Sequence, residues 1–479
     1  MTLPVATSAT AFATLLRAGQ LSAVELVEWH LARIDRLNPS LNAFIAVDHE
    51  GALRAARAAD DARAAGNALG PLHGVPVSIK SSVSVAGMPF ETGSRARAGI
   101  RGDADAPLVA RLRAAGAIVL GVTNVAEALM AWETVNPLYG RTNSPWALDR
   151  TPGGSSGGEA AAIAAGLSAG GIGSDGGGSI RVPAHFSGIC GLKPTPGRVP
   201  ATGHFPTCGG PFALTGVVGP MARTIGDLDL LFRVVSGPDA GDPNGHPVPL
   251  DPFATIDQLR RNDSRLVIGV FEDDGIVPVD AATRGAVRQA ARWLEDVGFR
   301  VEAARPEWLE EARVLWWAIF GRASRLLLTP GIRGHEADVH PNLVEFLEWT
   351  ERDPLLTAGE LLQVEMARDA LRGRMLEFMA RVPILLCPVA PMPAFRHGER
   401  SWTIEGRTVH YLDAWRYTAW FNLLQNPGVT VPVATSPEGL PIGVQVVARP
   451  WDEAGALAVA SLIEQARGAW TPPPPPYGA

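Results

Sequence analysis

Hydrophobic and polar residues alternate at helical spacing in the first part of the chain. Apolar residues recur every three or four positions over residues 11–37, and Gly19 and Gln20 interrupt this pattern. Ser22 and Glu25 then have the spacing of a capping box, in which each side chain satisfies a free backbone N–H at the start of a helix. The pattern therefore predicts two helices separated near Gly19.

Stretches of strand length and stretches of helical periodicity then alternate along the chain. We predict strands at 75–79, 117–122, 266–271, 300–303 and 383–389, and helices at 51–65, 107–115, 124–132, 159–167, 281–297, 308–328 and 357–379. This alternation predicts an α/β fold with a largely parallel or mixed sheet. There is no internal repeat and no clear linker, so we expect one domain over residues 1–479, with a proline-rich tail extended on the surface.

The predicted helix at 308–328 is unusually rich in large aromatic side chains. It contains Trp316, Trp317 and Phe320. We favour packing in the core for these residues, because large aromatic groups dominate core burial. The alternatives are a helix that lines a substrate site and a helix that docks on another surface.

Composition and charge exclude several classes of protein. With 46% hydrophobic and 19% charged residues, the chain can bury a large core. The net charge of −7, without any dense block of Lys or Arg, argues against nucleic-acid binding. Cys190, Cys208 and Cys387 are too few and too scattered for a disulfide framework or a structural zinc site. We find neither a signal-peptide pattern nor a membrane-spanning stretch, so we expect a cytoplasmic protein in a reducing compartment.

The stretch at 151–181 is the strongest candidate for a functional site. It reads TPGGSSGGEAAAIAAGLSAGGIGSDGGGSIR, with serine-bearing glycine clusters at 153–158 and 176–179. Glycine at this density costs conformational entropy, so a fold keeps it where the backbone takes unusual angles or lies against a ligand.

Two familiar motifs match this stretch without the context that each requires. Residues 171–176 fit G-x-G-x-x-G, but the helix and the acidic partner of a dinucleotide site do not follow. Residues 153–157 fit G-x-S-x-G, but a loop-like segment stands where a nucleophile elbow needs a strand. His73, His185 or His204 could supply a base, although a lone histidine more often serves a structural network. No HExxH or His/Asp cluster indicates a metal.

A lysine could instead serve as the base for a serine nucleophile. A serine hydroxyl attacks only when a base takes its proton, and burial can lower the pKa of a lysine enough for that role. Lys80 at the end of the predicted strand, Ser155 and Ser179 could meet in one cleft, with glycine N–H groups facing a developing oxyanion. Spacing alone does not bring them together. A solvated Lys80 and glycines that serve only turns or close packing are the ordinary alternatives.

The segment 152–195 resembles the hallmark sequence of the amidase signature family almost position by position. It contains PGGSSGGEAAA and GSDGGGSIRVPAHFSGICGLKPT, and the pieces HGVPVSIK, TNVAE, NPGVTVPV and GLPIGVQ elsewhere also fit. Lys80 precedes Ser155 by 75 positions and Ser155 precedes Ser179 by 24, as in the family.

The resemblance implies a single α/β/α domain with a mixed central sheet and a three-residue catalytic centre. Ser179 corresponds to the nucleophile, Ser155 to the proton relay after a cis peptide, and Lys80 to the terminal base. Backbone N–H groups would form the oxyanion hole at Gly176, Gly177, Gly178 and Ser179. Leu129 and Met130 match a region that lines the acyl pocket in relatives. No metal or organic cofactor is implied.

Two positions depart from the family pattern. The residue after the lysine is often acidic in the family and here is Ser81, which would make a neutral Lys80 easier. Position 176 is commonly bulkier than glycine, so we expect either a more flexible oxyanion loop or a roomier acyl pocket.

The activity implied is hydrolysis of small-molecule carboxylic amides by an acyl-enzyme, and also of esters or carbamates (urethanes), because all three pass through a tetrahedral step. The alternative is the glutaminase component of a tRNA-dependent amidotransferase, which shares these residues and works with partner proteins. A non-catalytic binding protein is disfavoured, because all three catalytic positions are intact. The sequence predicts neither the individual substrate nor the oligomeric state.

Overall fold

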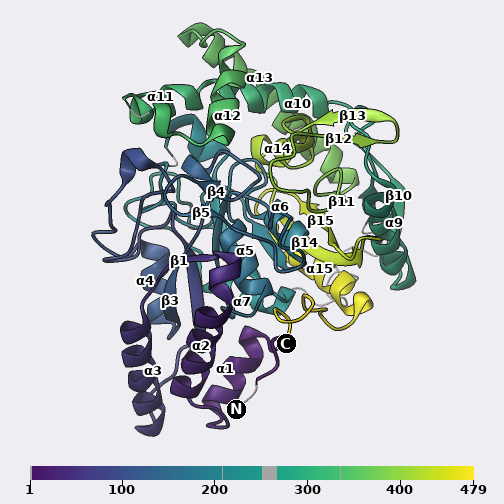
Figure 1. Cartoon of the computed structure of the whole chain (residues 1–479). Helices are drawn as coiled ribbons and strands as arrows, with labels where there is room; N and C mark the ends of the chain where they lie inside the picture. Colours follow the sequence, from purple (N-terminus) through teal and green to yellow (C-terminus); the bar gives the residue numbers. More distant parts are fainter. Residues whose placement is uncertain (1–2, 208, 251–266, 335) are drawn as a thin grey trace.

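A large mixed sheet forms the centre of the molecule (Figure 1). The computed structural model describes residues 3–207, 209–250, 267–334 and 336–479. Within these ranges eleven strands pair into one sheet. In spatial order they are β1 (Phe44–Val47), β3 (Ile118–Thr123), β2 (Pro76–Lys80), β6 (Gly170–Asp175), β8 (Val217–Ala222), β7 (Cys190–Lys193), β14 (Gly428–Thr435), β15 (Pro441–Ala448), β11 (Ile384–Pro388), β9 (Val267–Val270) and β10 (Arg300–Ala303).

The strand β2 is the element that positions the candidate site. It runs parallel to both of its neighbours, β3 and β6, and in this register Lys80 pairs with Thr123. The carboxyl ends of parallel strands meet at the same edge of a sheet, which is where α/β folds place their ligands. The ends of β2, β3 and β6 therefore bring Lys80, Thr123 and Asp175 to one edge.

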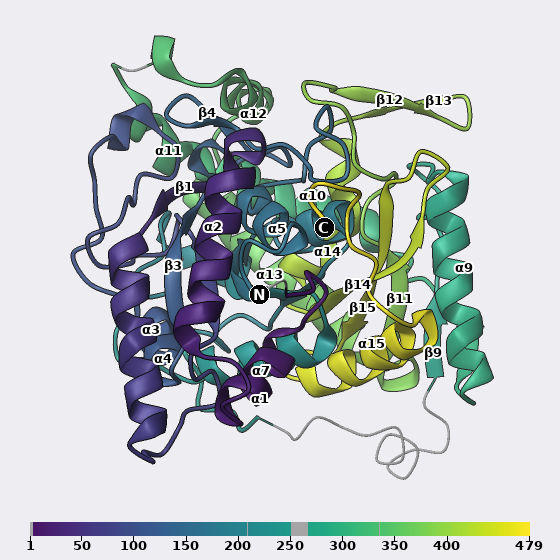
Figure 2. The ribbon, with the colours of Figure 1, turned by 60° about the horizontal axis from the view of Figure 1, so that its bottom comes forward.

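Helices cover both faces of this sheet (Figures 1 and 2). They are α1 (Ala9–Arg17), α2 (Ala23–Leu41), α3 (His49–Ala64), α4 (Pro107–Ala114), α5 (Gly157–Ala164), α6 (Arg181–Ser187), α7 (Ile225–Val235), α9 (Ala281–Asp296), α10 (Leu309–Trp316), α11 (Ser324–Ile332), α12 (Pro341–Glu351), α13 (Ala358–Arg381), α14 (Arg416–Leu423) and α15 (Glu453–Arg467). Two small hairpins, β4 (Val135–Asn136) with β5 (Gly140–Arg141) and β12 (Ser401–Ile404) with β13 (Arg407–His410), lie outside the sheet. This arrangement confirms the predicted α/β/α fold class.

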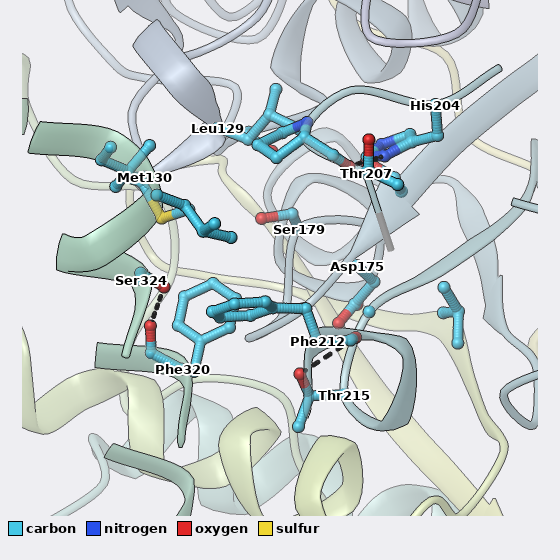
Figure 3. Close-up of a pocket in the computed structure, with 18 residues that line it drawn as sticks. Leu129, Met130, Asp175, Ser179, His204, Thr207, Phe212, Thr215, Phe320 and Ser324 are labelled. Carbon is cyan, nitrogen blue, oxygen red and sulfur yellow. Dashed lines mark hydrogen bonds between the residues drawn. The ribbon is translucent and has the colours of Figure 1, made fainter. Parts of the chain in front are cut away.

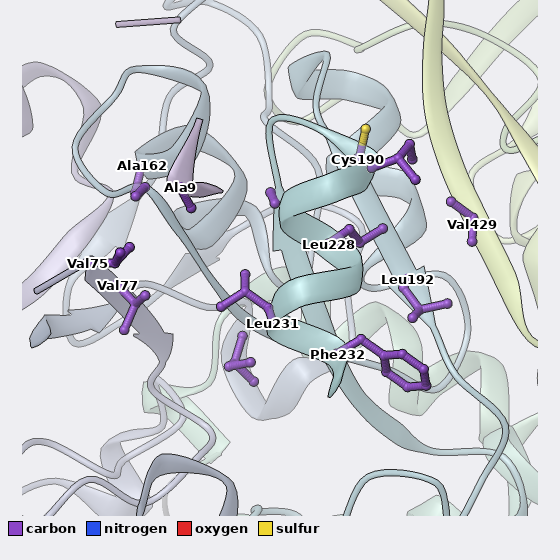
Figure 4. Packing of buried hydrophobic residues seen from close by; sticks show 14 of the residues in the cluster. Ala9, Val75, Val77, Ala162, Cys190, Leu192, Leu228, Leu231, Phe232 and Val429 are labelled. Carbon is purple, nitrogen blue, oxygen red and sulfur yellow. The ribbon is translucent and has the colours of Figure 1, made fainter. Parts of the chain in front are cut away.

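The two largest buried clusters of the described residues stabilise the layers. The larger one lies along the sheet, where Leu228, Leu231 and Phe232 of α7 pack near the strands that carry Val77 and Leu192 (Figure 4). The second cluster is aromatic and includes Trp132, Trp316, Trp415 and Trp420. Burying a large apolar side chain contributes about 1.5–3 kcal/mol, so both clusters contribute strongly to the stability of the fold.

Many predicted elements are present, and the glycine and capping residues seen in the sequence account for where the first two helices end and begin. The first two helices are separate, Gly19 takes a positive φ of 68° between them, and Ser22 and Glu25 form the capping box of α2. The strand predicted at 266–271 is β9 (Val267–Val270), while Leu266 and Cys208 lie outside the described residues. In the described part of the chain, no helix is long and apolar enough to cross a membrane.

Two local predictions are wrong, and one predicted helix is irregular. Residues 124–132 form only a 3₁₀ turn at Glu127–Leu129, because Ala128 and Leu129 have positive φ angles and the Ala128 N–H donates to the Thr92 carbonyl. The helix predicted at 308–328 is present, but it contains a π-helical turn, Trp317–Arg322, between α10 and α11. The C-terminal tail is not extended throughout, since it ends in a turn that buries Tyr477.

Candidate active site

Lys80 is a buried lysine at the carboxyl end of β2. Its side chain is fully buried, and its Nζ lies 2.7 Å from both Ser155 Oγ and Ser156 Oγ and 3.0 Å from Ser174 Oγ. Burial lowers the pKa of Lys80 to about 7, against the charges of Asp175 and Glu159, which raise it. A large neutral fraction is therefore present at ordinary pH, which gives the amine the chemistry of a base.

The first glycine cluster places two serines beside this lysine. The peptide bond between Gly154 and Ser155 is cis, as the family resemblance implies, and α5 begins directly after it at Gly157. Ser156 stands at the N-cap of α5 but its hydroxyl makes no cap, because it accepts from Lys80 and contacts the Ser174 carbonyl at 3.3 Å. Sequence reasoning missed Ser156 and Ser174; the only signal for Ser156 was its place beside Ser155.

The second glycine cluster follows β6 and carries Ser179. The N–H of Gly178 donates to Asp175 Oδ1 at 2.8 Å, so of the predicted oxyanion donors this one is already engaged. For the N–H groups of Gly176, Gly177 and Ser179 no partner is found within the described ranges. Buried backbone donors are nearly always paired, so these three are available for a ligand.

An ion pair fixes the base of the glycine loop. Asp175 and Arg181 are both fully buried and lie 3.0 Å apart, and Asp175 also accepts from the backbone N–H of Ile180. Burial by itself would raise the pKa of Asp175, but the charge and hydrogen bonds of Arg181 outweigh it and hold the pKa well below its usual range. The loop that carries Ser179 is thereby anchored at its start and at its end.

A second buried carboxyl, Glu159, lies behind the site. It accepts hydrogen bonds from Ser78, two residues before Lys80 in β2, and from Thr123 at 2.8 Å. Burial raises the pKa of Glu159 to about 7, although these hydroxyl donors and Lys80 oppose the rise. A Cβ at Gly171 would lie 1.9 Å from Glu159 Oε1, so the glycines of β6 let this carboxyl approach the sheet.

Ser155 and Ser179 open onto one cavity (Figure 3). It contains about 620 Å³ of space, part of it open solvent. The surface that lines the cavity is mostly apolar. The described lining residues are Leu129, Met130, Pro206, Phe212, Val217, Phe320, Leu327 and Leu328, together with Ser155, Ser174, Asp175, Gly176, Ser179, His204, Thr207, Thr215, Gly216 and Ser324. Figure 3 shows Ser179 near the middle of these groups. The hydroxyls of Ser155 and Ser179 share no hydrogen bond in the described structure.

Of the two expectations for position 176, the structure contradicts the roomier acyl pocket. A Cβ on Gly176 would lie 2.6 Å from the ring carbon Cε2 of Phe320. The pocket is therefore not roomier at this point, because an aromatic ring fills the space that a side chain would take. Phe320 comes from the π-helical turn, so its place at the cavity could not be read from helical periodicity.

Two of the candidate histidines, His185 and His204, form hydrogen bonds with neighbouring groups, and His204 also lines the cavity. His185 is fully buried, accepts from the Gly443 N–H at 2.8 Å and contacts the Met392 carbonyl at 3.1 Å. His204 lines the cavity, and its ring nitrogens contact Ser82 and the Pro206 carbonyl. Burial lowers the pKa of His204 to about 4, so its ring is neutral. Within the described ranges, no cluster of three or more His, Cys, Asp or Glu could hold a metal.

Comparison with known proteins agrees with this geometry. The sequence model of the Amidase family matches residues 25–457. The chain is 36% identical over 467 residues to the indoleacetamide hydrolase of Bradyrhizobium diazoefficiens, covering 96% of this chain and 86% of the relative. It is 34% identical over 477 residues to a glutamyl-tRNA(Gln) amidotransferase component of Chloroflexus aurantiacus, covering 95% and 96%.

A solved structure shows the same fold. The structure of 6-aminohexanoate cyclic dimer hydrolase complexed with substrate superposes with a TM-score of 0.84 and 30% identity, over 97% of this chain and 98% of that one. The likeness in sequence and in structure thus extends over nearly the whole chain. The chain therefore belongs to the amidase signature family and is an enzyme that hydrolyses carbon–nitrogen bonds of amides.

Proposed function

We propose that the enzyme hydrolyses amides with an apolar acyl group through an acyl-enzyme on Ser179. The observation that carries this proposal is the buried Lys80, whose Nζ lies 2.7 Å from Ser155 Oγ beside the cavity that Ser179 lines. A lysine with a pKa of about 7 is half neutral at pH 7 and can accept a proton from a hydroxyl.

The steps follow from this arrangement. Neutral Lys80 takes the proton of Ser155, and Ser155 takes the proton of Ser179. Ser179 Oγ then bonds to the carbonyl carbon of the amide, and the carbonyl oxygen of the substrate becomes an oxyanion. The carbon–nitrogen bond then breaks, and the proton returns through Ser155 to the leaving amine. Water adds to the acyl-enzyme by the same relay, so the carboxylic acid leaves and Lys80 is neutral again. Esters and carbamates pass through the same tetrahedral step, and we propose them as further substrates.

The oxyanion would be stabilised by backbone N–H groups of the glycine loop. Gly176, Gly177 and Ser179 are the candidates, because the Gly178 N–H is held by Asp175. Each donor that is already oriented stabilises the transition state without reorganisation, and removing one such donor typically slows an enzyme by about 10²–10³-fold.

The residues that line the cavity indicate which kind of acyl group the cavity accepts. Leu129, Met130, Phe212 and Phe320 present apolar surface close to Ser179. The indoleacetamide hydrolase relative is named for an aromatic acyl group, and the cyclic dimer hydrolase for an amide of an unbranched aliphatic acid. We therefore propose aryl and medium-length alkyl carboxamides as the best substrates.

The alternative is the glutaminase component of an amidotransferase, which the Chloroflexus relative supports. Glutamine carries an ammonium and a carboxylate, and a pocket for it needs a charged partner for each. Of the described residues lining the cavity, Asp175 is the one carboxylate and is paired with Arg181, and no lysine or arginine is among them. Turnover of apolar anilides by the isolated chain, without turnover of glutamine, would contradict this alternative.

The test is a pair of variants assayed with a chromogenic anilide. Ser179→Ala should abolish turnover and also abolish labelling by a serine-directed fluorophosphonate, located by mass spectrometry of the modified peptide. Ser461→Ala on α15, far along the chain from the site, is the control and should retain both. Retained turnover in Ser179→Ala would overturn the assignment of the nucleophile.

A further inference from the structure

Two indole groups and a threonine hold the glycine loop from outside the cavity. Trp316, at the end of α10, donates from Nε1 to the Gly176 carbonyl at 2.9 Å. Trp132 donates from Nε1 to the Gly177 carbonyl at 3.0 Å, and Thr418 donates to the same oxygen at 2.9 Å. Two consecutive carbonyls of the loop are therefore fixed by side chains that come from distant parts of the chain.

Holding a carbonyl also orients the N–H of the same peptide. A trans peptide is planar, and its C=O and N–H point in opposite directions. Trp316 holds the Gly176 carbonyl, so it also fixes the direction of the Gly177 N–H, which has no partner among the residues described here. Trp132 and Thr418 act on the next peptide, whose Gly178 N–H is already bound to Asp175. Of these three side chains, Trp316 thus orients the donor that remains available.

The indole of Trp316 also packs closely against this peptide. A Cβ on Gly177 would lie 2.7 Å from Trp316 Cζ2, so glycine at 177 allows the ring to reach the loop. Trp316 is nearly fully buried and stacks on Phe320, with ring centroids 4.7 Å apart and planes 14° apart. Phe320 lines the cavity, whereas Trp316 does not.

We propose that Trp316 is a positioning residue for the oxyanion hole. Its indole N–H holds the peptide between Gly176 and Gly177 so that the Gly177 N–H faces the oxygen of the tetrahedral intermediate. Trp316 does not touch the substrate and acts only through this peptide. The inference rests on the proposed acyl-enzyme mechanism and assigns a role to a residue outside the hallmark segment.

Trp316→Phe tests the hydrogen bond while keeping an aromatic ring against Phe320. An oxyanion donor acts on the transition state and not on the bound substrate, so kcat should fall about 10- to 100-fold while KM stays within about twofold. The matched control is Trp317→Phe, the same change at the adjacent residue, for which the described structure shows no hydrogen bond to the loop. It should keep kcat within about twofold.

A second measurement separates positioning from a merely structural role. A trifluoromethyl ketone with the same acyl group adds the Ser179 hydroxyl across its carbonyl, and the resulting hemiketal places an oxyanion in the hole. Trp316→Phe should weaken this inhibitor by the same factor as kcat and leave the affinity for the product carboxylic acid unchanged. Equal losses for both ligands, or a kcat equal to that of Trp317→Phe, would overturn the proposal.

The proposed mechanism has its own readout. If the fluorophosphonate does not label Ser179 of the unchanged enzyme, the acyl-enzyme mechanism fails. If it labels Ser179 and Trp316→Phe behaves like Trp317→Phe, the mechanism stands and the role of Trp316 fails.

Discussion

The cavity joins two regions of the molecule that are built in different ways. Its inner side is the sheet edge at the ends of β2 and β6, where Lys80 is fully buried and bonded to three serines. Its outer wall includes Phe320 of the π-helical turn and Leu327 of α11, and Leu327 is 54% exposed. A buried, fully bonded edge admits few substitutions, whereas an exposed wall admits many. We propose that the edge sets the reaction and the wall sets the choice of substrate.

The largest expected effect comes from the inner edge. Lys80→Met keeps an unbranched side chain as far as Cε and removes the amine, so turnover should fall by about 10³–10⁴-fold for every substrate alike. The free energy of unfolding should change little, because the loss of the hydrogen bonds to three serines is offset by the removal of an amine whose charged form burial disfavours. Steady-state kinetics on several amides and thermal unfolding measure the two effects.

A change in the ranking of substrates by Lys80→Met would contradict the comparison, since it would mean that the edge also selects substrates. Ser84→Ala is a matched control shortly after β2 in the chain, where the hydroxyl donates to the Ala104 carbonyl and not to Lys80. This variant should retain turnover.

A smaller effect is expected from the outer wall. Phe320→Ala removes the ring beside Gly176 and enlarges the cavity there, so kcat/KM for branched or bicyclic acyl groups should rise relative to that for acetyl. A change of about 10- to 100-fold in this ratio is typical for reshaping an apolar pocket. The ratio is measured by competition between two anilides in one assay.

Leu326→Ala provides the comparison for the wall. Leu326 is exposed on α11 and is not among the described residues that line the cavity, unlike its neighbour Leu327. The Leu326→Ala variant should leave the ratio of kcat/KM between bulky and acetyl substrates unchanged. Equal shifts in Phe320→Ala and Leu326→Ala would show that selectivity does not follow contact with the cavity.

The smallest expected effect concerns Glu159, which lies behind the edge and touches no substrate. In the proposed mechanism neutral Lys80 is the active form, so kcat/KM should rise with pH through about 7. The Glu159 carboxylate raises the pKa of Lys80, so Glu159→Gln should lower it and move the acidic limb to lower pH. Asp175 also raises the pKa of Lys80 and is unchanged in this variant, whereas the nearby His204 is neutral. The shift of the acidic limb should therefore be at most about one pH unit. A pH–rate profile measures it, and a limb that moves upward would contradict the role of Glu159.

Regular periodicity of apolar residues made much of the fold predictable. One central strand could not be predicted, because half of its residues are glycine. The helices α2, α9 and α13 and the strands β2, β3 and β11 lie close to their predicted ranges. The strand β6 reads Gly-Gly-Ile-Gly-Ser-Asp, which has no strand propensity. Its glycines are needed because Glu159 and the neighbouring strand approach too closely for side chains. That contact is tertiary and leaves no periodic signal.

For the candidate site, the resemblance located more than periodicity did. Matching positions point to Lys80, Ser155 and Ser179, and the structure brings them to one cavity edge, although their catalytic roles stay predictions. For Trp316 and Phe320 the sequence favoured packing in the core. A π-helical turn shifts the phase of the helix, so the side that Phe320 presents to the cavity could not be deduced from a 3.6-residue period.

The ion pair between Asp175 and Arg181 has a consequence for how substrates arrive. The carboxylate of the cavity is neutralised by its partner, and the active form of Lys80 carries no charge. We therefore expect the proposed reactive centre to project little field into solvent, so that dissolved ions have little attraction to screen there. We therefore predict that kcat/KM for an uncharged amide hardly changes with ionic strength.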